Sequence, residues 1–207
     1  MNRIGFWIAR ALREDARLAP LSVPQAEVLA AWRGARIALV GNARALAGTR
    51  RGTEIDAADH VIRINRAPMP DVASHGTRTD ALALATRLAP ARLADLSPAR
   101  VMWMSPKRKR LTWAVATTPG FYLHPRADYD ALKARLGAPP TTGAMMIDLL
   151  ARSGAARVDL FGFDFFASLS LSGRRQAADV PHDFGAEATW VHTLIAQDSR
   201  FILHPNG

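Results

Sequence analysis

The chain of 207 residues contains no cysteine. It can therefore form no disulfide and no zinc–thiolate site, and it offers no thiol nucleophile. A chain without cysteine is typical of a reducing compartment, so we expect a cytoplasmic protein. Long apolar runs are also missing. The run near the start, residues 4–9, is too short for a transmembrane helix or for the apolar region of a signal peptide.

Acidic residues are few compared with basic ones. The 18 Asp and Glu residues stand against 27 Lys and Arg residues, which gives a formal net charge of +9. Such a protein attracts anions, which include phosphates, acidic sugars, nucleic acid and anionic lipids. The densest basic run, PKRKR at 106–110, is typical of a solvated loop or helix face, with a nucleic-acid or membrane contact as the alternative.

Residues 1–33 are predicted to form a basic, amphipathic helical segment with helices near 4–14 and 24–32. Phe6 and Trp7 stand among arginines in the first of these helices. The pattern favours a helix that packs on the rest of the protein. The alternative is a peripheral contact with an anionic membrane, such as the inner membrane surface.

From residue 34 to residue 207, short β-compatible runs alternate with helix-like segments. The predicted strands are 36–41, 60–65, 80–86, 100–104, 157–163 and 200–205, and the main helices are 126–137, 141–154 and 186–198. The alternation predicts one α/β domain whose mostly parallel sheet has helices on both faces. Ligands of such sheets bind at the carboxyl ends of the strands, so the residues just past the strands are the first candidates.

The first candidate stretch is VGNARALAGTRRG at 40–52. Its glycines fit neither the dinucleotide fingerprint nor the P-loop. Gly41 at a strand end would allow close backbone approach, and Asn42 offers two donors and an acceptor for a base, ribose or phosphate. The alternative is a plain glycine turn with Arg50 and Arg51 in solvent.

Two further stretches carry groups suited to an anion. Asn65 and Arg66 follow the strand 60–65 and are expected beside Asn42, with amide donors and a cation around one anionic ligand. The stretch PTTG brings Thr141, Thr142 and Gly143 to a helix start, where backbone N–H groups and the helix dipole favour phosphate or carboxylate. Simple N-capping by threonine is the alternative.

The stretch HDFGAE places His182 just before a helix and Glu187 within its first residues. A histidine at a polar helix entry suits a general base near neutral pH. The plain alternative is a surface histidine and an acid that complements the helix dipole. The DYD triplet at 128–130 resembles a metal-binding pair of aspartates, but it begins a predicted helix, where acids also serve the dipole. We therefore expect no metal there.

Taken in order, these stretches resemble glycosyltransferase family 29, the sialyltransferase family. ALVGNARALAGTRRGTEIDAADHVIRINRAP with HGTRTD is similar to its large motif, PPTTGAMMIDLLARSGAARVDLFGFD to its small motif, and HDFGAE to its very small motif. The resemblance implies a single Rossmann-like domain, a GT-A-like sialyltransferase variant, over residues 34–207. It also implies an inverting transfer of sialic acid from a CMP-activated donor to a glycan hydroxyl, with no metal or other cofactor.

The resemblance assigns roles to individual residues. His182 falls on the family's general base, and Glu187 falls on the acid of that motif, which we expect to be a structural partner. The residues expected to bind the nucleotide and donor are Gly41, Asn42, Asn65, Arg66, Thr141, Thr142, Gly143 and Gly162. The expected partners are the CMP-sugar donor and a glycan or glycolipid acceptor, and no nucleic acid.

The chain also departs from the family pattern. Residues 165–181 contain no counterpart of a further histidine motif, and Arg174 or Arg175 is the candidate replacement for its phosphate contact. Ile37 and Ala155 stand where the animal enzymes have a disulfide, and we expect them to form an apolar contact. Without the membrane anchor of the animal enzymes, a bacterial enzyme that builds a surface glycan is expected.

Three alternatives stay open from the sequence. The donor sugar could be Kdo, which shares the CMP linkage and the carboxylate with sialic acid. The chain could bind CMP without catalysis, because the histidine motif is missing. The net charge and the PKRKR run leave a basic nucleic-acid-binding module as the rival from another class.

Overall fold

The computed structural model describes residues 1–164 and 181–205. Within them the chain forms one seven-stranded sheet in the order β5-β4-β3-β2-β1-β6-β7, and every neighbouring pair is parallel. The strands are β1 (Arg36–Val40), β2 (His60–Ile64), β3 (Ala81–Leu84), β4 (Arg100–Trp103), β5 (Tyr122–Leu123), β6 (Arg157–Phe161) and β7 (Phe201–Leu203). The predicted α/β fold with a mostly parallel sheet is confirmed.

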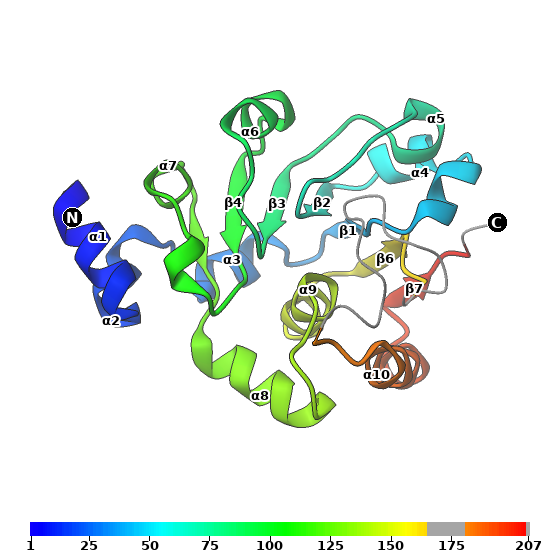
Figure 1. The fold of residues 1–207 in the computed structure, drawn as a ribbon. Helices are drawn as coiled ribbons and strands as arrows, with labels where there is room; N and C mark the ends of the chain where they lie inside the picture. The colour runs from blue at the N-terminus through cyan, green and yellow to red at the C-terminus, as the bar shows by residue number, and fades with distance from the viewer. Residues whose placement is uncertain (165–180, 206–207) are drawn as a thin grey trace.

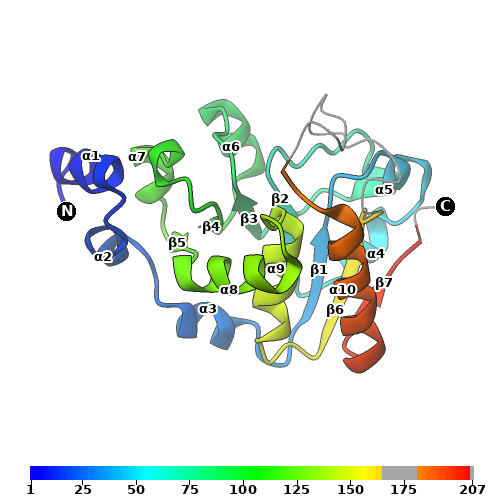
Figure 2. The same ribbon diagram turned by 60° about the horizontal axis from the view of Figure 1, so that its bottom comes forward.

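Helices cover both faces of the sheet, as predicted (Figure 1). The α-helices are α1 (Arg3–Leu12), α2 (Asp15–Leu18), α3 (Gln25–Ala31), α4 (Gly52–Asp56), α5 (Val72–His75), α6 (Pro90–Leu96), α7 (Trp113–Ala116), α8 (Arg126–Leu136), α9 (Thr142–Ala151) and α10 (Phe184–Gln197). The 3₁₀ helices are η1 (Ala19–Leu21), η2 (Arg44–Gly48) and η3 (Arg108–Arg110). Figure 2 shows α8, α9 and α10 together on one face.

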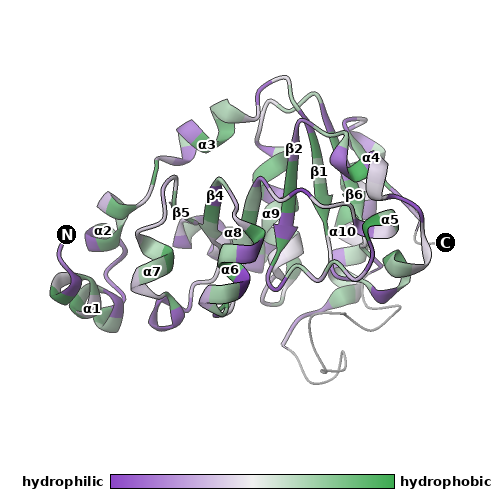
Figure 3. Ribbon diagram, turned by 90° about the horizontal axis from the view of Figure 1, so that it is seen from above, coloured by the Kyte–Doolittle hydropathy of each residue, from purple (hydrophilic) through white to green (hydrophobic). Residues whose placement is uncertain are grey.

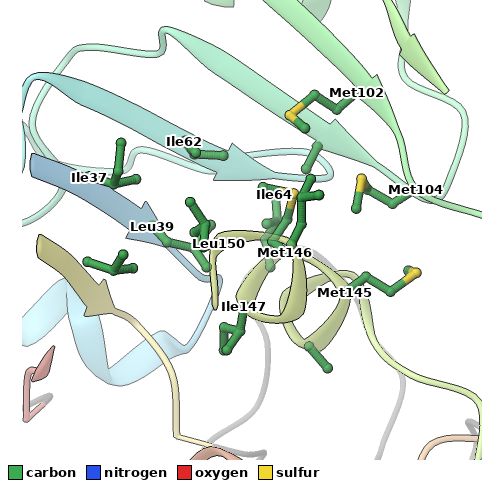
Figure 4. Close-up of a cluster of buried hydrophobic side chains, with 14 of the residues drawn as sticks. Ile37, Leu39, Ile62, Ile64, Met102, Met104, Met145, Met146, Ile147 and Leu150 are labelled. Atoms are coloured by element: carbon green, nitrogen blue, oxygen red, sulfur yellow. The ribbon is translucent and has the colours of Figure 1, made fainter. Parts of the chain in front are cut away.

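Alternate side chains of β1 point to opposite faces of the sheet and belong to two different parts of the core. Ile37 and Leu39 pack with α9, whereas Ala38 and Val40 pack with Ile55 of α4 on the other side. Helix α9 is apolar nearly all round, and residues 142–150 are all buried. A helix with that pattern needs burial on every side, which explains its central place in the core (Figure 4). In Figure 3 the central strands β1 and β2 are mostly green, the colour of hydrophobic residues.

The strand order places a switch point between β1 and β6. The chain builds β1 to β5 in one direction and then returns to the other side of β1 to form β6 and β7. The crossovers from β1 and β6 therefore leave the sheet in opposite directions. Ligands of open α/β sheets bind at the carboxyl ends of the strands next to such a switch point.

The N-terminal segment packs on the sheet domain through one side of its helices. Phe6 and Ala9 of α1 are fully buried, and the ring of Phe6 lies 5.2 Å from that of Trp113 in α7. The expected packing of this amphipathic helix is thus present. The opposite side of α1 leaves Ile4 71% exposed and Leu12 62% exposed.

The PKRKR run is divided between core and solvent, so its prediction as a solvated face is wrong at its centre. Arg108 is 1% exposed. Its guanidinium donates two bonds to the carboxylate of Asp15, of 2.9 and 2.7 Å, and two more to the carbonyl oxygens of Ser105 and His124. Burial of a cation requires this full set of partners. Arg108 therefore fastens α2 to the loop after β4.

Candidate active site

Two glycines bring the backbones of β1 and β6 together at the switch point. The Gly41 N–H donates to the carbonyl oxygen of Phe161 at 2.7 Å, and the Ala43 N–H donates to that of Gly162 at 3.1 Å. A Cβ atom on Gly41 would overlap the Gly162 carbonyl oxygen, and Gly162 itself has a φ of 68°. The close approach at Gly41 is thus to the backbone of Gly162, and its approach to a ligand stays a prediction. Both glycines therefore shape the carboxyl edge of the sheet.

Asn42 and Asn65 connect the neighbouring strand ends. The Asn42 side chain is 8% exposed, and its Nδ2 donates to the carbonyl oxygen of Ile64 at 3.2 Å. Asn65 adopts a left-handed φ of 53°, which asparagine tolerates better than most residues. Its Oδ1 accepts from the Ala85 N–H at 3.0 Å, and its Nδ2 donates to Thr142 Oγ1 at 3.2 Å. The structure thus brings the two asparagines together, as the sequence predicts.

The start of α9 completes this edge. Thr141 is the N-cap, and its Oγ1 accepts from the Ala144 N–H at 3.1 Å. Thr142 and Gly143 lie in the first turn, where backbone N–H groups have no acceptor inside the helix. A Cβ atom on Gly143 would lie 2.7 Å from Cε1 of Phe163, so the glycine leaves room for that ring. N-capping by threonine is therefore observed, and donor binding by this turn stays a prediction.

Glu187 fastens α10 to the start of α9. Its two carboxylate oxygens accept from the Thr141 N–H at 2.6 Å and from the Thr141 hydroxyl at 2.8 Å. The side chain is buried, and burial raises the pKa of Glu187 to about 7 against the lowering effect of these two bonds. The idea of a surface acid that only complements the dipole of α10 is wrong. The geometry is that of a structural partner between the two helices.

His182 lies beside the loop that leads into α9. Its Nδ1 is 2.7 Å from the carbonyl oxygen of Pro139. A carbonyl oxygen can only accept, so Nδ1 carries the hydrogen and the neutral ring presents Nε2 as an acceptor. The ring is partly buried. His182 is thus held through Nδ1, and Nε2 is the ring nitrogen that can accept a proton.

Arg66 is exposed and faces a different part of the edge from the asparagine side chains. It lines a cavity of about 410 Å³ together with residues of the segments after β2 and β3.

Elsewhere in the large motif, Arg51 forms an ion pair with Glu54 at 2.8 Å. The alternative of two arginines free in solvent is therefore wrong for Arg51.

Arg63 is a structural residue of the large motif that sequence reasoning treated as an ordinary strand position. It is 1% exposed, and its guanidinium donates to the carbonyl oxygens of Arg78 and His75 at 2.8 and 2.6 Å. Burial lowers the pKa of Arg63 to about 10. Arg63 holds the HGTRTD loop against β2. No local pattern in the sequence indicates this role, because the acceptors are backbone carbonyl oxygens.

One group in the described part of the chain has the spacing of metal ligands. It consists of Glu54, Asp159 and His204, whose ligand atoms lie within 4.8 Å of one another. The Asp159 carboxylate already accepts two bonds of 2.8 Å from Arg157 and lies 2.6 Å from Nε2 of His204. These contacts explain the group as a partly buried network of hydrogen bonds around the ion pair between Arg157 and Asp159. Asp128 of the DYD triplet pairs with Arg152 at 2.7 Å.

The positions that differ from the family pattern are only partly described. Ile37 and Ala155 are both buried in the same apolar cluster, as expected for a replacement of the disulfide. Arg174 and Arg175 lie outside the described residues. Over the described residues, no helix is both long enough and apolar enough to span a membrane.

Known proteins share the fold of this chain and part of its sequence pattern. The sequence model of glycosyltransferase family 29 (sialyltransferase) matches residues 18–118, whereas curated proteins gave no match. The fold is similar to a mammalian sialyltransferase in complex with Gal-beta-1-3GalNAc-ortho-nitrophenol, with a TM-score of 0.65 at 20% identity over 99% of this chain and 86% of that chain.

The sialyltransferase CstII from Campylobacter jejuni is also similar. Its complex with cytidine-5'-monophosphate gives a TM-score of 0.56 at 12% identity over 83% of this chain and 79% of that chain. Its complex with CMP-3FNeuAc gives 0.55 at 12% identity over 82% and 81%. The expected Rossmann-like fold of the sialyltransferase type is confirmed. Residues 18–118, which include the large motif, thus match glycosyltransferase family 29, and the chain has the fold of the sialyltransferases that it resembles.

Proposed function

We propose that the chain is an inverting glycosyltransferase that moves sialic acid from a CMP-activated donor to a hydroxyl group of a glycan or glycolipid, without a metal ion. The observation that carries the proposal is His182, whose Nδ1 is fixed on the Pro139 carbonyl oxygen next to the start of α9. The related solved structures support the choice of donor, since one contains CMP and another contains CMP-3FNeuAc.

The donor would lie along the edge formed by β1, β2, β6 and α9. Asn42 and Asn65 offer amide groups to the nucleotide, and Gly41 and Gly162 allow the backbone to come close to it. The phosphate would face the first turn of α9 at Thr142 and Gly143, where N–H groups favour an anion. Both the donor carboxylate and the leaving phosphate are anionic, which suits a protein of net charge +9.

The transfer itself needs one base and one stabilised leaving group. Nε2 of His182 takes the proton of the acceptor hydroxyl while its oxygen attacks the anomeric carbon from the face opposite the phosphate. The bond from the anomeric carbon to the phosphate oxygen breaks, and its electron pair leaves with CMP. Backbone N–H groups stabilise the charge that develops on the phosphate, which is the task that a metal performs in other transferases.

The proposal is tested with purified protein, CMP-Neu5Ac, CMP-Kdo and a panel of glycan acceptors, by following CMP release with and without EDTA. We expect acceptor-dependent release from CMP-Neu5Ac at the same rate in both conditions. Faster turnover of CMP-Kdo would reassign the donor, and loss of activity in EDTA would contradict the metal-free mechanism. Calorimetry with CMP alone provides a readout that needs no acceptor. Absence of both binding and turnover would refute the proposal.

We also propose that α1 rests on an anionic membrane, where a lipid-linked acceptor would be presented. Its exposed side carries large apolar side chains, and the exposed residues Arg3 and Arg13 supply positive charge. The exposed apolar residues are Met1, Ile4, Trp7, Ile8 and Leu12. Burial of one such side chain is worth about 1.5–3 kcal/mol, and each nearby cation adds about 1 kcal/mol at an anionic surface.

Vesicle binding tests the membrane proposal. The double variant Ile4→Ser/Leu12→Ser should bind phosphatidylglycerol-containing vesicles at least about tenfold more weakly than the native chain, because two apolar side chains no longer enter the lipid. Val72→Ser is the matched control, since Val72 is also 62% exposed but belongs to α5. Equal sedimentation of all three proteins with vesicles would show that α1 makes no membrane contact.

A further inference from the structure

A basic cavity that is open to solvent lies next to Asn65 of the proposed donor site. It has a volume of about 410 Å³ and is lined by Arg66, Pro68, Arg87, Leu88, Ala89 and Arg92. These residues belong to the segments that follow β2 and β3 and to the start of α6. The volume lies within the range of about 300–1,000 Å³ that is usual for small-molecule sites.

The cavity has three cations and no acid in its lining. The guanidinium groups of Arg66 and Arg87 make no hydrogen bond or ion pair with any residue of 1–164 or 181–205. Arg92 is oriented by the backbone, because its Nε donates to the Arg66 carbonyl oxygen at 3.3 Å and its Nη2 to that of Ala67 at 2.5 Å. Carbonyl oxygens fix a guanidinium but do not cancel its charge. The cavity is therefore positively charged.

Neighbouring arginines respond to this charge. The pKa of Arg10 is lowered, mainly by burial and further by the charge of Arg87. Arg92 likewise adds to the effect of burial in lowering the pKa of Arg63. Arg87 and Arg92 thus add positive charge to their surroundings, and a surface with several cations close together attracts anions.

The turn after β2 is built to present Arg66. Asn65 and Ala67 both have a positive φ, 53° and 44°, which is costly for residues other than glycine. The Ala67 N–H donates to the Ile64 carbonyl oxygen at 3.1 Å, and Arg92 holds the other side of the turn. Arg66 is thus directed outward into the cavity while the preceding residue, Asn65, faces α9.

We propose that this cavity binds an anionic group, a phosphate or a carboxylate, on the sugar acceptor. The inference rests on the proposed function and deepens it: the donor candidates gather around β1, β6 and α9, so the cavity on the β2–β3 side is left for the acceptor. A guanidinium pairs with a phosphate or carboxylate through two parallel hydrogen bonds. The apolar atoms of Pro68 and Leu88 suit the C–H face of a sugar ring.

Direct binding tests the inference without the need for turnover. Calorimetry compares galactose 6-phosphate and galacturonic acid with neutral galactose and with inorganic phosphate. We expect both acidic sugars to bind and galactose to bind at least about tenfold more weakly, because charged hydrogen bonds are lost. Equal affinity for acidic and neutral sugars would overturn the inference. Inorganic phosphate that binds as tightly as galactose 6-phosphate would overturn its sugar part.

A matched pair of variants locates the effect. Arg87→Gln should weaken binding of the acidic sugars by about tenfold to hundredfold and leave CMP affinity unchanged. Arg33→Gln removes one exposed arginine at the opposite, amino edge of the sheet and should change neither affinity. Equal behaviour of the two variants would overturn the assignment to the cavity. If Arg87→Gln weakened only vesicle binding, the anion would be a lipid phosphate and the acceptor assignment would fall.

The outcomes separate this inference from the proposed function. A native chain that binds acidic sugars in the cavity but no CMP would support the cavity as an anion site and refute the transferase proposal. A native chain that binds CMP but no acidic sugar would leave the transferase proposal intact and refute the inference.

Discussion

Replacement of His182 by alanine is expected to lower the turnover of the CMP-sugar by about 10²–10⁴-fold, the usual contribution of a positioned general base. The affinity for CMP should stay within about twofold of the native value, because the contacts of Asn42 and Asn65 do not involve the histidine. Single-turnover kinetics and calorimetry with CMP measure the two quantities separately. The reason for the large effect is that Nε2 alone of the ring nitrogens is available as an acceptor once Nδ1 donates to Pro139.

His192→Ala is the matched control for this variant. His192 lies further along α10 and is exposed, and the proposed mechanism gives it no part. We expect its turnover to equal that of the native chain. Retention of native turnover by His182→Ala would mean that another group takes the proton. Loss of CMP affinity in that variant would instead make His182 part of the nucleotide site.

The alternation of strands and helices along the chain could be predicted because the strands are short, apolar and flanked by turn residues. β1 and β6 are buried on both faces, and their apolar runs, interrupted in β6 by Asp159, are easily recognised. β5 was missed because it has only two residues, Tyr122 and Leu123, and its pairing with β4 leaves no periodic pattern. The short helices between the strands were missed for the same reason: four or five residues hold no full amphipathic repeat.

Buried charges were the least predictable feature. Arg108 appears in the sequence as one of four basic residues in a run, and nothing local distinguishes it from its exposed neighbours. Its carboxylate partner, Asp15, is 93 positions away. The guanidinium of Arg63 likewise donates to carbonyl oxygens of a loop. Every residue has such an oxygen, so the side chains of the loop do not indicate the contact. Partners that are distant in sequence, or that are backbone atoms, cannot be read from a local pattern.

The candidate site was predictable in its members but not in its hydrogen bonds. Asn42, Asn65 and Thr142 were expected at one edge because each follows a strand or begins a helix. The tautomer of His182 depends on a carbonyl oxygen of the loop before α9, and proline can supply one as well as any residue. The raised pKa of Glu187 depends on burial between α9 and α10, which only the packed structure defines.

Gly41→Ala is expected to remove donor binding and to destabilise the fold, because the new Cβ atom would overlap a backbone atom. The Gly162 carbonyl oxygen cannot rotate away as a side chain can, and the strands before it are paired up to Val40 and Phe161. The carboxyl ends of β1 and β6 would have to separate. We expect a loss of about 2–4 kcal/mol in the free energy of unfolding and, for a chain of this size, a Tm lower by roughly 5–15 °C.

Gly48→Ala separates this close approach from the general effect of replacing a loop glycine. Gly48 ends η2 in the same stretch, and a Cβ atom there would meet no atom within 4 Å. Its stability should therefore stay within about 0.5 kcal/mol of the native value, and its CMP affinity should be unchanged. Gly41→Ala moves the next residue, Asn42, away from the Ile64 carbonyl oxygen, so its CMP affinity should fall more than tenfold even where it is folded. If both variants bound CMP equally, the contact between β1 and β6 would be a packing feature and the donor would lie elsewhere along the edge.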